Sequence, residues 1–379
     1  MRQAGGDRSL LQRINTVAVL RALHRADFLT LRDLAATAGV SRNTAEDAAL
    51  ALVSVGLTEE VMPEVEDQRR VGRPAKRYRF RAEAGFVVGV DLAAHEVNVL
   101  VTDLRGCQRA QQSRPLDPHA TADVRLATAG EALHSAIRSA GIRPTDIWAI
   151  GAATTGIVDH TGRVARSFRL PQIQGRNLAE DLAIVPGAPV VVGNDARMAT
   201  LAERWRGAAR DTDNFVNIVA GRHITAGIFL NGQLLRGAHG AAGEIGVLAE
   251  SHWIAALQAM ADWPNGRRAT FAAAAAGDPA ARTRIKDLAE RLATGIAALV
   301  LSVDPECVIV SGGLSRAGDT LLGPLQAHLD TKILFPIPIR PSTLDHDAVA
   351  LGAVRHALNH VEKELFNTES AHLAGAIFT

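Results

Sequence analysis

The feature that most constrains the fold of this sequence is a strand–turn–strand pattern that occurs twice. The first copy reads FVVGVDL and HEVNVLVTDLRG at residues 86–92 and 95–106, and the second reads NFVNIVA and ITAGIFLNGQLLRG at 214–220 and 224–237. Each copy has an apolar strand, a polar turn and a returning strand of alternating pattern that ends in glycine. A unit that occurs twice predicts two lobes of the same architecture.

Helical stretches and short apolar strands alternate around these two copies. The helices are expected at 124–140, 196–205 and 280–303, and the strands at 147–152, 189–193 and 307–310. Strands that alternate with helices indicate an α/β domain whose ligands bind in a central cleft.

Composition narrows the class of protein further. The 379 residues are 47% hydrophobic, which is enough for the cores of two or three domains, and the formal net charge is +1. A chain this close to neutral can contact nucleic acid only through a local basic patch. Cys107 and Cys307 lie far apart and have no neighbouring cysteine, so the sequence argues against a disulfide framework or a thiolate metal site.

Two features of the sequence argue against a membrane protein. No apolar run has the roughly 18 uncharged residues that a membrane span needs, and residues 1–13 lack the apolar core of a signal peptide. We therefore expect a cytoplasmic protein with no membrane partner, associated with the nucleoid through any DNA that it binds.

Three helices are predicted in the first part of the chain. The first covers Thr16–Ala26, where apolar residues recur at helical spacing. Thr30 is a suitable N-cap for the second, which ends at Gly39, because glycine readily adopts the left-handed conformation at a helix end. Ser41 caps the third helix, and Gly56 closes it. This order is typical of a helix-turn-helix, whose second helix offers its first turn to the DNA major groove.

The first turn of that last helix carries the predicted base-reading residues. They are Ser41, Arg42, Asn43 and Thr44. Arginine can pair with guanine or with phosphate, and asparagine can pair with adenine. Glu46 and Asp47 suit DNA less well, because a carboxylate near phosphates is unfavourable, although one of them could accept from a cytosine amine. The alternative is an ordinary three-helix module that does not contact DNA.

A basic strip, RRVGRPAKRYRF at 69–80, follows an acidic stretch. Strands at 57–61 and 78–81 would make this region the hairpin wing of a winged helix, with a polar turn at 63–68. Arg73 is predicted to enter a narrow A·T-rich minor groove from the stiff Gly-Arg-Pro segment. The predicted phosphate contacts are Arg69, Arg70, Lys76 and Arg77. The alternative is that the strip is a solvated linker between two domains.

Beyond the winged helix, four motifs carry a resemblance to a known family. They are GVDL at 89–92, VVGNDA at 191–196, LNGQLLRGAHGAAGEIG at 230–246 and VIVSGGLS at 308–315. Together with the winged helix, they resemble the ROK family, which comprises sugar-responsive repressors, unassigned open reading frames and sugar kinases. The resemblance covers residues 10–360, and RGAHGAAGEIG at 236–246 is its most specific motif.

The resemblance implies a fold, domain boundaries and partners. The fold is α/β, with an N-terminal winged helix-turn-helix followed by a two-lobed actin-like or hexokinase-like (ribonuclease H-like) ATPase fold. The winged helix would occupy 1–81 and the ROK domain 82–379, with lobe 1 at 82–193 plus a C-terminal helix at 345–365, and lobe 2 at 194–344. The family also implies a homodimer or tetramer that binds double-stranded operator DNA and responds to a sugar or sugar phosphate in the cleft.

Several positions depart from the kinases of this family. Their first phosphate loop reads Asp-x-Gly-Gly-Thr, because glycine lets backbone amides approach phosphate closely, whereas this chain has DLAAH at 91–95. The second loop, AGRHITAG at 220–227, carries side chains where phosphate would lie. Val247 replaces a histidine, and residues 248–260 lack the cysteines of the family's zinc loop. These departures predict a chain that is not an enzyme and uses neither a metal nor a cofactor.

Three positions that match the family's sugar site remain. Asp195 matches the catalytic base of the kinases, and it is either a vestige of that base, a ligand contact or a helix cap. Asn194 beside it is a second expected effector contact. Glu244 matches the sugar-binding glutamate, with a loop-stabilising role as the alternative.

These observations predict a transcriptional repressor that a sugar-like effector controls through a degenerate kinase-like domain. Two alternatives stay open. The first is an active, ATP-dependent sugar kinase fused to a DNA-binding module. The second is a DNA-binding protein that responds to no ligand.

Overall fold

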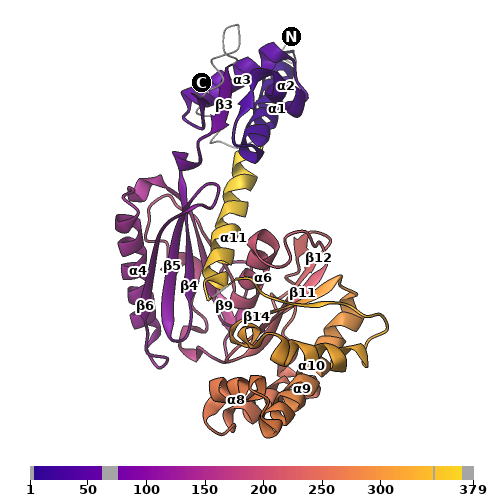
Figure 1. Ribbon diagram of the computed structural model, residues 1–379. Coiled ribbons are helices and arrows are strands. Elements are labelled where there is room, and N and C mark those ends of the chain that lie inside the picture. The colour runs from indigo at the N-terminus through magenta and orange to yellow at the C-terminus, as the bar shows by residue number, and fades with distance from the viewer. Residues whose placement is uncertain (1–3, 62–75, 345, 369–379) are drawn as a thin grey trace.

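The computed structural model describes residues 4–61, 76–344 and 346–368. Its N-terminal part contains α1 (Ala4–Arg25), β1 (Leu29–Thr30), α2 (Leu31–Ala38), α3 (Arg42–Ser54), β2 (Thr58–Val61) and β3 (Arg77–Phe80). The strands form an antiparallel sheet in the order β1-β3-β2 beside the three helices (Figure 1). Three helices with a strand hairpin after the third are the arrangement of a winged helix. The turn predicted at 63–68 lies outside the described residues.

Local capping explains where α2 and α3 begin. The hydroxyl of Thr30 accepts a hydrogen bond from the Asp33 amide, and the hydroxyl of Ser41 accepts one from the Thr44 amide. Gly39 ends α2 with a φ of 68°, in the left-handed region that glycine adopts without a steric cost. The predicted caps of both helices are therefore confirmed.

Helix α1 is longer than the sequence predicted. It begins at Ala4, whereas the apolar periodicity indicated a start at Thr16. Leu10, Leu11 and Ile14 in its first half are all exposed. Because these side chains face away from the core, no buried stripe marks this part of the helix in the sequence.

The two copies of the strand–turn–strand pattern form the centres of two five-stranded sheets. The first sheet has the order β10-β7-β4-β5-β6 and the second has the order β15-β14-β11-β12-β13. Their strands are β4 (Phe86–Leu92), β5 (Glu96–Asp103), β6 (Gln108–Pro115), β7 (Ile147–Thr154), β10 (Val190–Asn194), β11 (Phe215–Ala220), β12 (Ile224–Leu230), β13 (Gln233–Leu234), β14 (Cys307–Ser311) and β15 (Ile339–Pro341).

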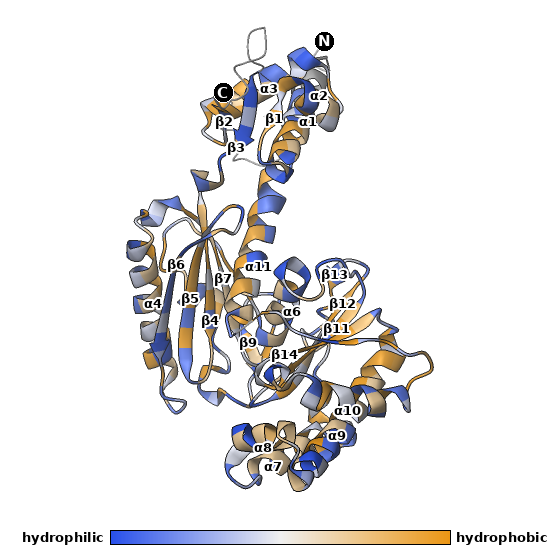
Figure 2. Cartoon of the chain, in the orientation of Figure 1, coloured by the Kyte–Doolittle hydropathy of each residue, from blue (hydrophilic) through white to orange (hydrophobic). Residues whose placement is uncertain are grey.

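The strand directions in the two sheets correspond one to one. In each sheet the first strand of the duplicated unit, β4 or β11, pairs antiparallel with the next strand and parallel with a strand that follows a helix. Each sheet then gains one more parallel strand on that side and one antiparallel strand at the other edge. The predicted duplication into two lobes is thus confirmed. Figure 2 shows β11 and β12 as hydrophobic and the edge strand β6 as hydrophilic.

Helices cover both sheets. The α-helices of this part are α4 (Ala122–Ser139), α5 (Leu178–Asp181), α6 (Asp195–Arg206), α7 (Trp253–Ala261), α8 (Gly266–Ala275), α9 (Pro279–Val303), α10 (Asp319–Asp330) and α11 (Ala348–Leu365), and a small hairpin is formed by β8 (Ile157–Val158) and β9 (Val164–Arg166). No helix in the described ranges combines the length and the apolar character that a membrane span needs.

Helix α11 joins the two parts of the molecule. Figure 1 shows it running from between the two lobes to the winged-helix module. Its N-terminal half packs closely on the first sheet, and a Cβ atom at Gly89 or Gly151 would collide with its backbone carbonyls. Its C-terminal half contributes Leu358 and Val361 to one core with Leu20 of α1. One rigid helix therefore contacts both the sheet beside the cleft and the N-terminal module.

Candidate functional site

The first turn of α3 presents two exposed polar side chains. Arg42 and Asn43 are exposed and have no capping duty, whereas Ser41 and Thr44 are engaged with each other, with their hydroxyl oxygens 2.8 Å apart. Ser41 also holds the Thr44 amide at 3.1 Å. Of the four residues predicted to read bases, Arg42 and Asn43 are thus free to reach a groove, while Ser41 and Thr44 stabilise the turn that presents them.

An ion pair connects α3 to the residue that precedes β3. The ammonium group of Lys76 lies 2.9 Å from Glu46 Oε1, and this hydrogen bond raises the pKa of the lysine. Lys76 is one of the residues predicted to bind phosphate. Its partner, Glu46, is one of the two acids whose charge is unfavourable near DNA phosphates. The guanidinium of Arg77 lies over the ring of Phe28, 4.9 Å from its centroid. Sequence reasoning missed both contacts because the partners lie far apart in the chain.

The rest of the basic strip is only partly accounted for by the structure. Arg79 forms ion pairs with Glu59 and Glu83, and Arg81 donates to the carbonyl of Gly56 at 3.1 Å. Acids on both sides of the strip, Glu59 and Glu83, therefore neutralise part of its positive charge. The three arginines predicted for the wing tip lie outside the described residues; they are Arg69, Arg70 and Arg73.

Asn194 ends β10 and caps α6. Its Oδ1 accepts from the Arg197 amide at 3.1 Å, and its Nδ2 donates to the carbonyl of Gly156 at 2.8 Å. Both ends of the side chain are therefore used within the protein. They tie the start of α6 to the loop after β7, and this fixes the position of the next residue, Asp195.

Asp195 begins α6 and lies near two other acids, the half-buried Glu244 and the buried Asp91. Burial raises its pKa to about 7, and the negative charge of Glu244 adds to the rise. Burial also raises the pKa of Glu244, which the positive charge of Arg197 opposes. Asp91 at the end of β4 is buried, and its pKa is raised well above its usual value by burial and by the charge of Asp195. The structure thus brings the two predicted acids together and adds Asp91.

Carboxyl groups in this setting can bind a polyhydroxylated ligand. A carboxyl with a pKa near 7 can donate or accept a hydrogen bond, and burial strengthens each bond by excluding water. Within the described ranges, no group of three histidine, cysteine or acidic side chains is arranged to hold a metal ion.

The two phosphate-loop segments touch each other. The ring of His95, from the turn after β4, contacts the guanidinium of Arg222, from the turn between β11 and β12. Arg267 of α8 donates to the Gly221 carbonyl at 2.7 Å, and Arg169 donates to the Arg222 carbonyl at 3.3 Å. Side chains from both lobes thus meet where glycine-rich loops would otherwise approach a phosphate. Sequence reasoning missed Arg169 and Arg267, because neither belongs to a loop motif.

Comparison with known proteins identifies the family to which this chain belongs. The ROK family model matches residues 87–252 and 255–359, which is most of the chain. The chain belongs to the ROK family. Its relatives include a β-glucoside kinase from Listeria monocytogenes, which is 30% identical over 56% of this chain and 80% of its own length. They also include the xylose repressor of Bacillus subtilis, which is 20% identical over 93% of this chain and 97% of its own length.

Solved ROK structures share the fold. A ROK family transcriptional regulator, a homologue of the E. coli MLC protein, superposes with a TM-score of 0.74 at 21% identity and covers 97% of this chain and 99% of its own. A ROK hexokinase from Thermus thermophilus superposes with a TM-score of 0.61 at 27% identity, but covers only 73% of this chain. The predicted fold class, a winged helix followed by a two-lobed kinase-like domain, is confirmed.

Proposed function

We propose that this ROK protein is a DNA-binding transcriptional repressor whose kinase-like domain binds a sugar-like effector. The observation that carries the proposal is the double packing of α11, on the sheet beside the cleft and on α1 of the winged helix. A ligand that favours one arrangement of the lobes can act on DNA only through an element that both parts share. The full-length similarity to a xylose repressor supports this assignment.

The domain division follows from this role. Residues 1–81 read the operator, and residues 82–379 sense the ligand, with lobe 1 at 82–193 and 345–365 and lobe 2 at 194–344. A homodimer would place two recognition helices on a palindromic site. Arg42 and Asn43 would then contact bases, and the basic residues of the wing would contact the DNA backbone. These backbone contacts are Arg69, Arg70, Arg73, Lys76 and Arg77.

The effector would bind at the N-terminus of α6. Burial raises the pKa of both Asp195 and Glu244, and that of Asp195 to about 7, so the desolvation cost of a charged carboxylate is reduced when Asp195 pairs with a neutral hydroxyl group. Asn194 acts through its cap, which aims Asp195 into the site. A ligand rich in hydroxyl groups, such as a sugar, satisfies these partners best.

A second function, sugar phosphorylation, is favoured by one observation. A pKa of about 7 suits Asp195 to act as a general base toward a sugar hydroxyl at neutral pH. The contact between His95 and Arg222 argues against it, because these side chains take the place of backbone amides that would cradle ATP phosphates. We therefore rank the kinase below the repressor.

One experiment tests the repressor. The purified chain is mixed with the DNA upstream of its own gene, with and without a panel of sugars and sugar phosphates, and binding is measured by fluorescence anisotropy. We expect specific binding that one ligand weakens and that Arg42→Ala also weakens. Specific binding that no ligand changes, together with a thermal stability that none of them shifts, would favour a ligand-independent DNA-binding protein. Sugar-dependent ATP turnover that Asp195→Asn abolishes would instead establish the kinase.

A further inference from the structure

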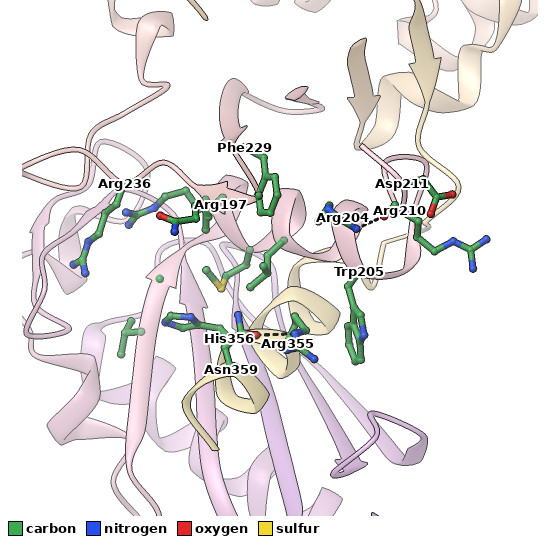
Figure 3. A pocket seen from close by; sticks show the side chains of 17 residues that line it. Arg197, Arg204, Trp205, Arg210, Asp211, Phe229, Arg236, Arg355, His356 and Asn359 are labelled. Carbon is green, nitrogen blue, oxygen red and sulfur yellow. Dashed lines mark hydrogen bonds between the residues drawn. The ribbon is translucent and has the colours of Figure 1, made fainter. Parts of the chain in front are cut away.

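A cavity of about 680 Å³ lies beside α6, on the side that faces α11 and the hairpin of β12 and β13 (Figure 3). The side chains of Met198, Leu201 and Phe229 form an apolar part of its lining. The acids Asp195 and Glu244 are not among its lining residues. The cavity is therefore a separate space from the proposed effector site at the N-terminus of the same helix.

Two arginines at one end of the cavity share a single backbone acceptor. Arg197 and Arg236 lie close together in Figure 3, and their Nη2 atoms point at the carbonyl of Val158 from 3.4 and 3.5 Å. Arg197 is only 4% exposed, and its Nε has no hydrogen-bond partner in the described part of the chain. Burial and the charge of Arg236 lower the pKa of Arg197 to about 10. Two cations thus repel each other across one neutral acceptor.

Two of the other three arginines that line the cavity have acidic partners, whereas Arg210 forms no ion pair with the residues that the structure describes. Arg204 pairs with Asp213 at 2.9 Å, and Arg355 pairs with Glu362 at 2.5 Å. Across the residues that the structure describes, neither Arg197 nor Arg236 forms an ion pair. The cleft acids act on Arg197 at a distance but do not bond to it. Arg197 is therefore a buried guanidinium group with no bonded counter-charge, and the exposed Arg236 beside it adds a second positive charge. An anion between the two would relieve both the burial cost and the repulsion.

A neutral histidine completes this end. His356 of α11 lines the cavity, and burial together with the charges of Arg197 and Arg236 lowers its pKa to about 4. A neutral imidazole adds one hydrogen-bond donor without adding a third cation. The combination of two guanidinium groups and one imidazole matches the oxygen atoms of a phosphate or a carboxylate.

We propose that this cavity is a second ligand site, which binds a small anion with its phosphate or carboxylate between Arg197 and Arg236 and its apolar part against Met198, Leu201 and Phe229. The site goes beyond the proposed function, because it takes a different ligand from the sugar cleft. Like the sugar cleft, the cavity is connected to the winged helix through α11. His356 and Asn359 of α11 line the cavity, while Leu358 and Val361 of the same helix pack in the core of the N-terminal module.

Isothermal titration of the full chain with three probes tests the site. Phenyl phosphate and benzoate carry the two candidate anionic groups on a ring that fits the apolar wall, and benzyl alcohol has the ring without the charge. We expect one equivalent of phenyl phosphate or of benzoate to bind, benzyl alcohol not to bind, and the stronger of the two anions to identify the preferred group.

Variants locate the binding. Arg236 is exposed, so Arg236→Gln should fold, and it should weaken anion binding by about tenfold, the usual effect of losing one charge-assisted hydrogen bond. Arg222→Gln, in the phosphate loop, should leave the affinity unchanged. The proposal is overturned if neither anion binds, if Arg236→Gln binds as well as the parent chain, or if Arg222→Gln abolishes binding. Because phenyl phosphate and benzoate carry no sugar hydroxyl groups, a failure here is distinct from a failure of the sugar site.

Discussion

The carboxylate of Glu46, in α3, forms an ion pair with Lys76 beside the strand β3, with Nζ and Oε1 2.9 Å apart. The pair partly neutralises the charge of an acid in α3. In the proposed complex, a cation at this distance would reduce the repulsion between the carboxylate and the DNA phosphates. The pair also connects α3 to the start of β3, so the two surfaces proposed to contact DNA are held at one relative position.

Glu46→Gln should strengthen DNA binding. Without the carboxylate, Lys76 is free to contact phosphate, and we expect the affinity to rise roughly fivefold, or about 1 kcal/mol for one surface charge. The dependence of the logarithm of the affinity on the logarithm of salt concentration should steepen by about one. Anisotropy titrations at several salt concentrations measure both. Glu131→Gln, on the exposed face of α4, is the matched control. Weaker binding by Glu46→Gln would mean that this carboxylate accepts from a cytosine.

Arg42→Ala should weaken specific DNA binding more than it weakens non-specific binding. The Arg42 side chain is exposed in the first turn of α3 and has no role in the cap, so truncation removes a base contact and leaves the helix intact. We expect a loss of about 1–3 kcal/mol at the operator. Competition titrations with operator and scrambled DNA measure the difference, and Arg138→Ala on α4 is the control. An equal loss on both DNAs would assign Arg42 to phosphate.

Asp195 should give the free energy of unfolding a defined pH dependence. Its folded pKa is about 7, whereas an unfolded aspartate titrates at about 3.9. Between these values the folded chain holds a proton that the unfolded chain has lost. The stabilising contribution is therefore fully present below about pH 4 and is lost as the pH rises through about 7. Asp91 shifts in the same direction and adds to the slope.

Asp195→Asn removes this contribution, because an amide does not titrate. Between pH 5 and pH 8 its free energy of unfolding should fall less than that of the parent chain, by on the order of 2 kcal/mol. Urea unfolding at a series of pH values measures the difference. Asp262→Asn, at an exposed aspartate, should keep the parent slope. Parallel curves for the parent chain and Asp195→Asn would show that burial does not raise this pKa.

Leu358→Ala should damage the junction between α11 and the winged helix. Leu358 is 1% exposed in the core that α11 shares with α1, and truncation of a buried leucine costs about 2–5 kcal/mol. The folded variant should still bind operator DNA, but its response to the effector should decrease, because α11 no longer fits the N-terminal module closely. Leu301→Ala, at a leucine that is 54% exposed, should change stability by less than about 0.5 kcal/mol. An unchanged effector response would show that the signal does not pass through α11.

Local chemistry is why much of the fold could be predicted from the sequence. The caps at Thr30 and Ser41 and the glycine at 39 act within one helical turn, so a short stretch of sequence contains all of their partners. The two copies of the strand pattern could be predicted equally well, because the alternation of apolar and polar residues along a strand indicates which face is buried. The first half of α1 could not be predicted, because its leucines are exposed and form no buried apolar stripe.

The parts of the site that could not be predicted depend on distant partners. Lys76 and Glu46 are thirty residues apart, and Arg267 reaches the second loop from α8. No periodicity or spacing encodes such pairs. The cavity beside α6 was missed for the same reason, because its arginines come from separate elements that only the packing of α6, α11 and the β12–β13 hairpin brings together.

The packing of α11 on the first sheet makes opposite predictions for two glycines. A Cβ atom at Gly151 of β7 would collide with the backbone carbonyl of Ala353 in α11, which cannot move without shifting the helix. Gly151→Ala should therefore destabilise the chain by about 1–3 kcal/mol. At Gly130, inside α4, the nearest atom to a new Cβ is the Ile184 Cδ1 at 3.6 Å, an ordinary contact. Gly130→Ala should stabilise the chain by about 0.4–1 kcal/mol, because alanine loses less backbone entropy on folding. Urea unfolding of both variants measures the contrast, and equal effects of the two substitutions would contradict the close approach of α11 to the sheet.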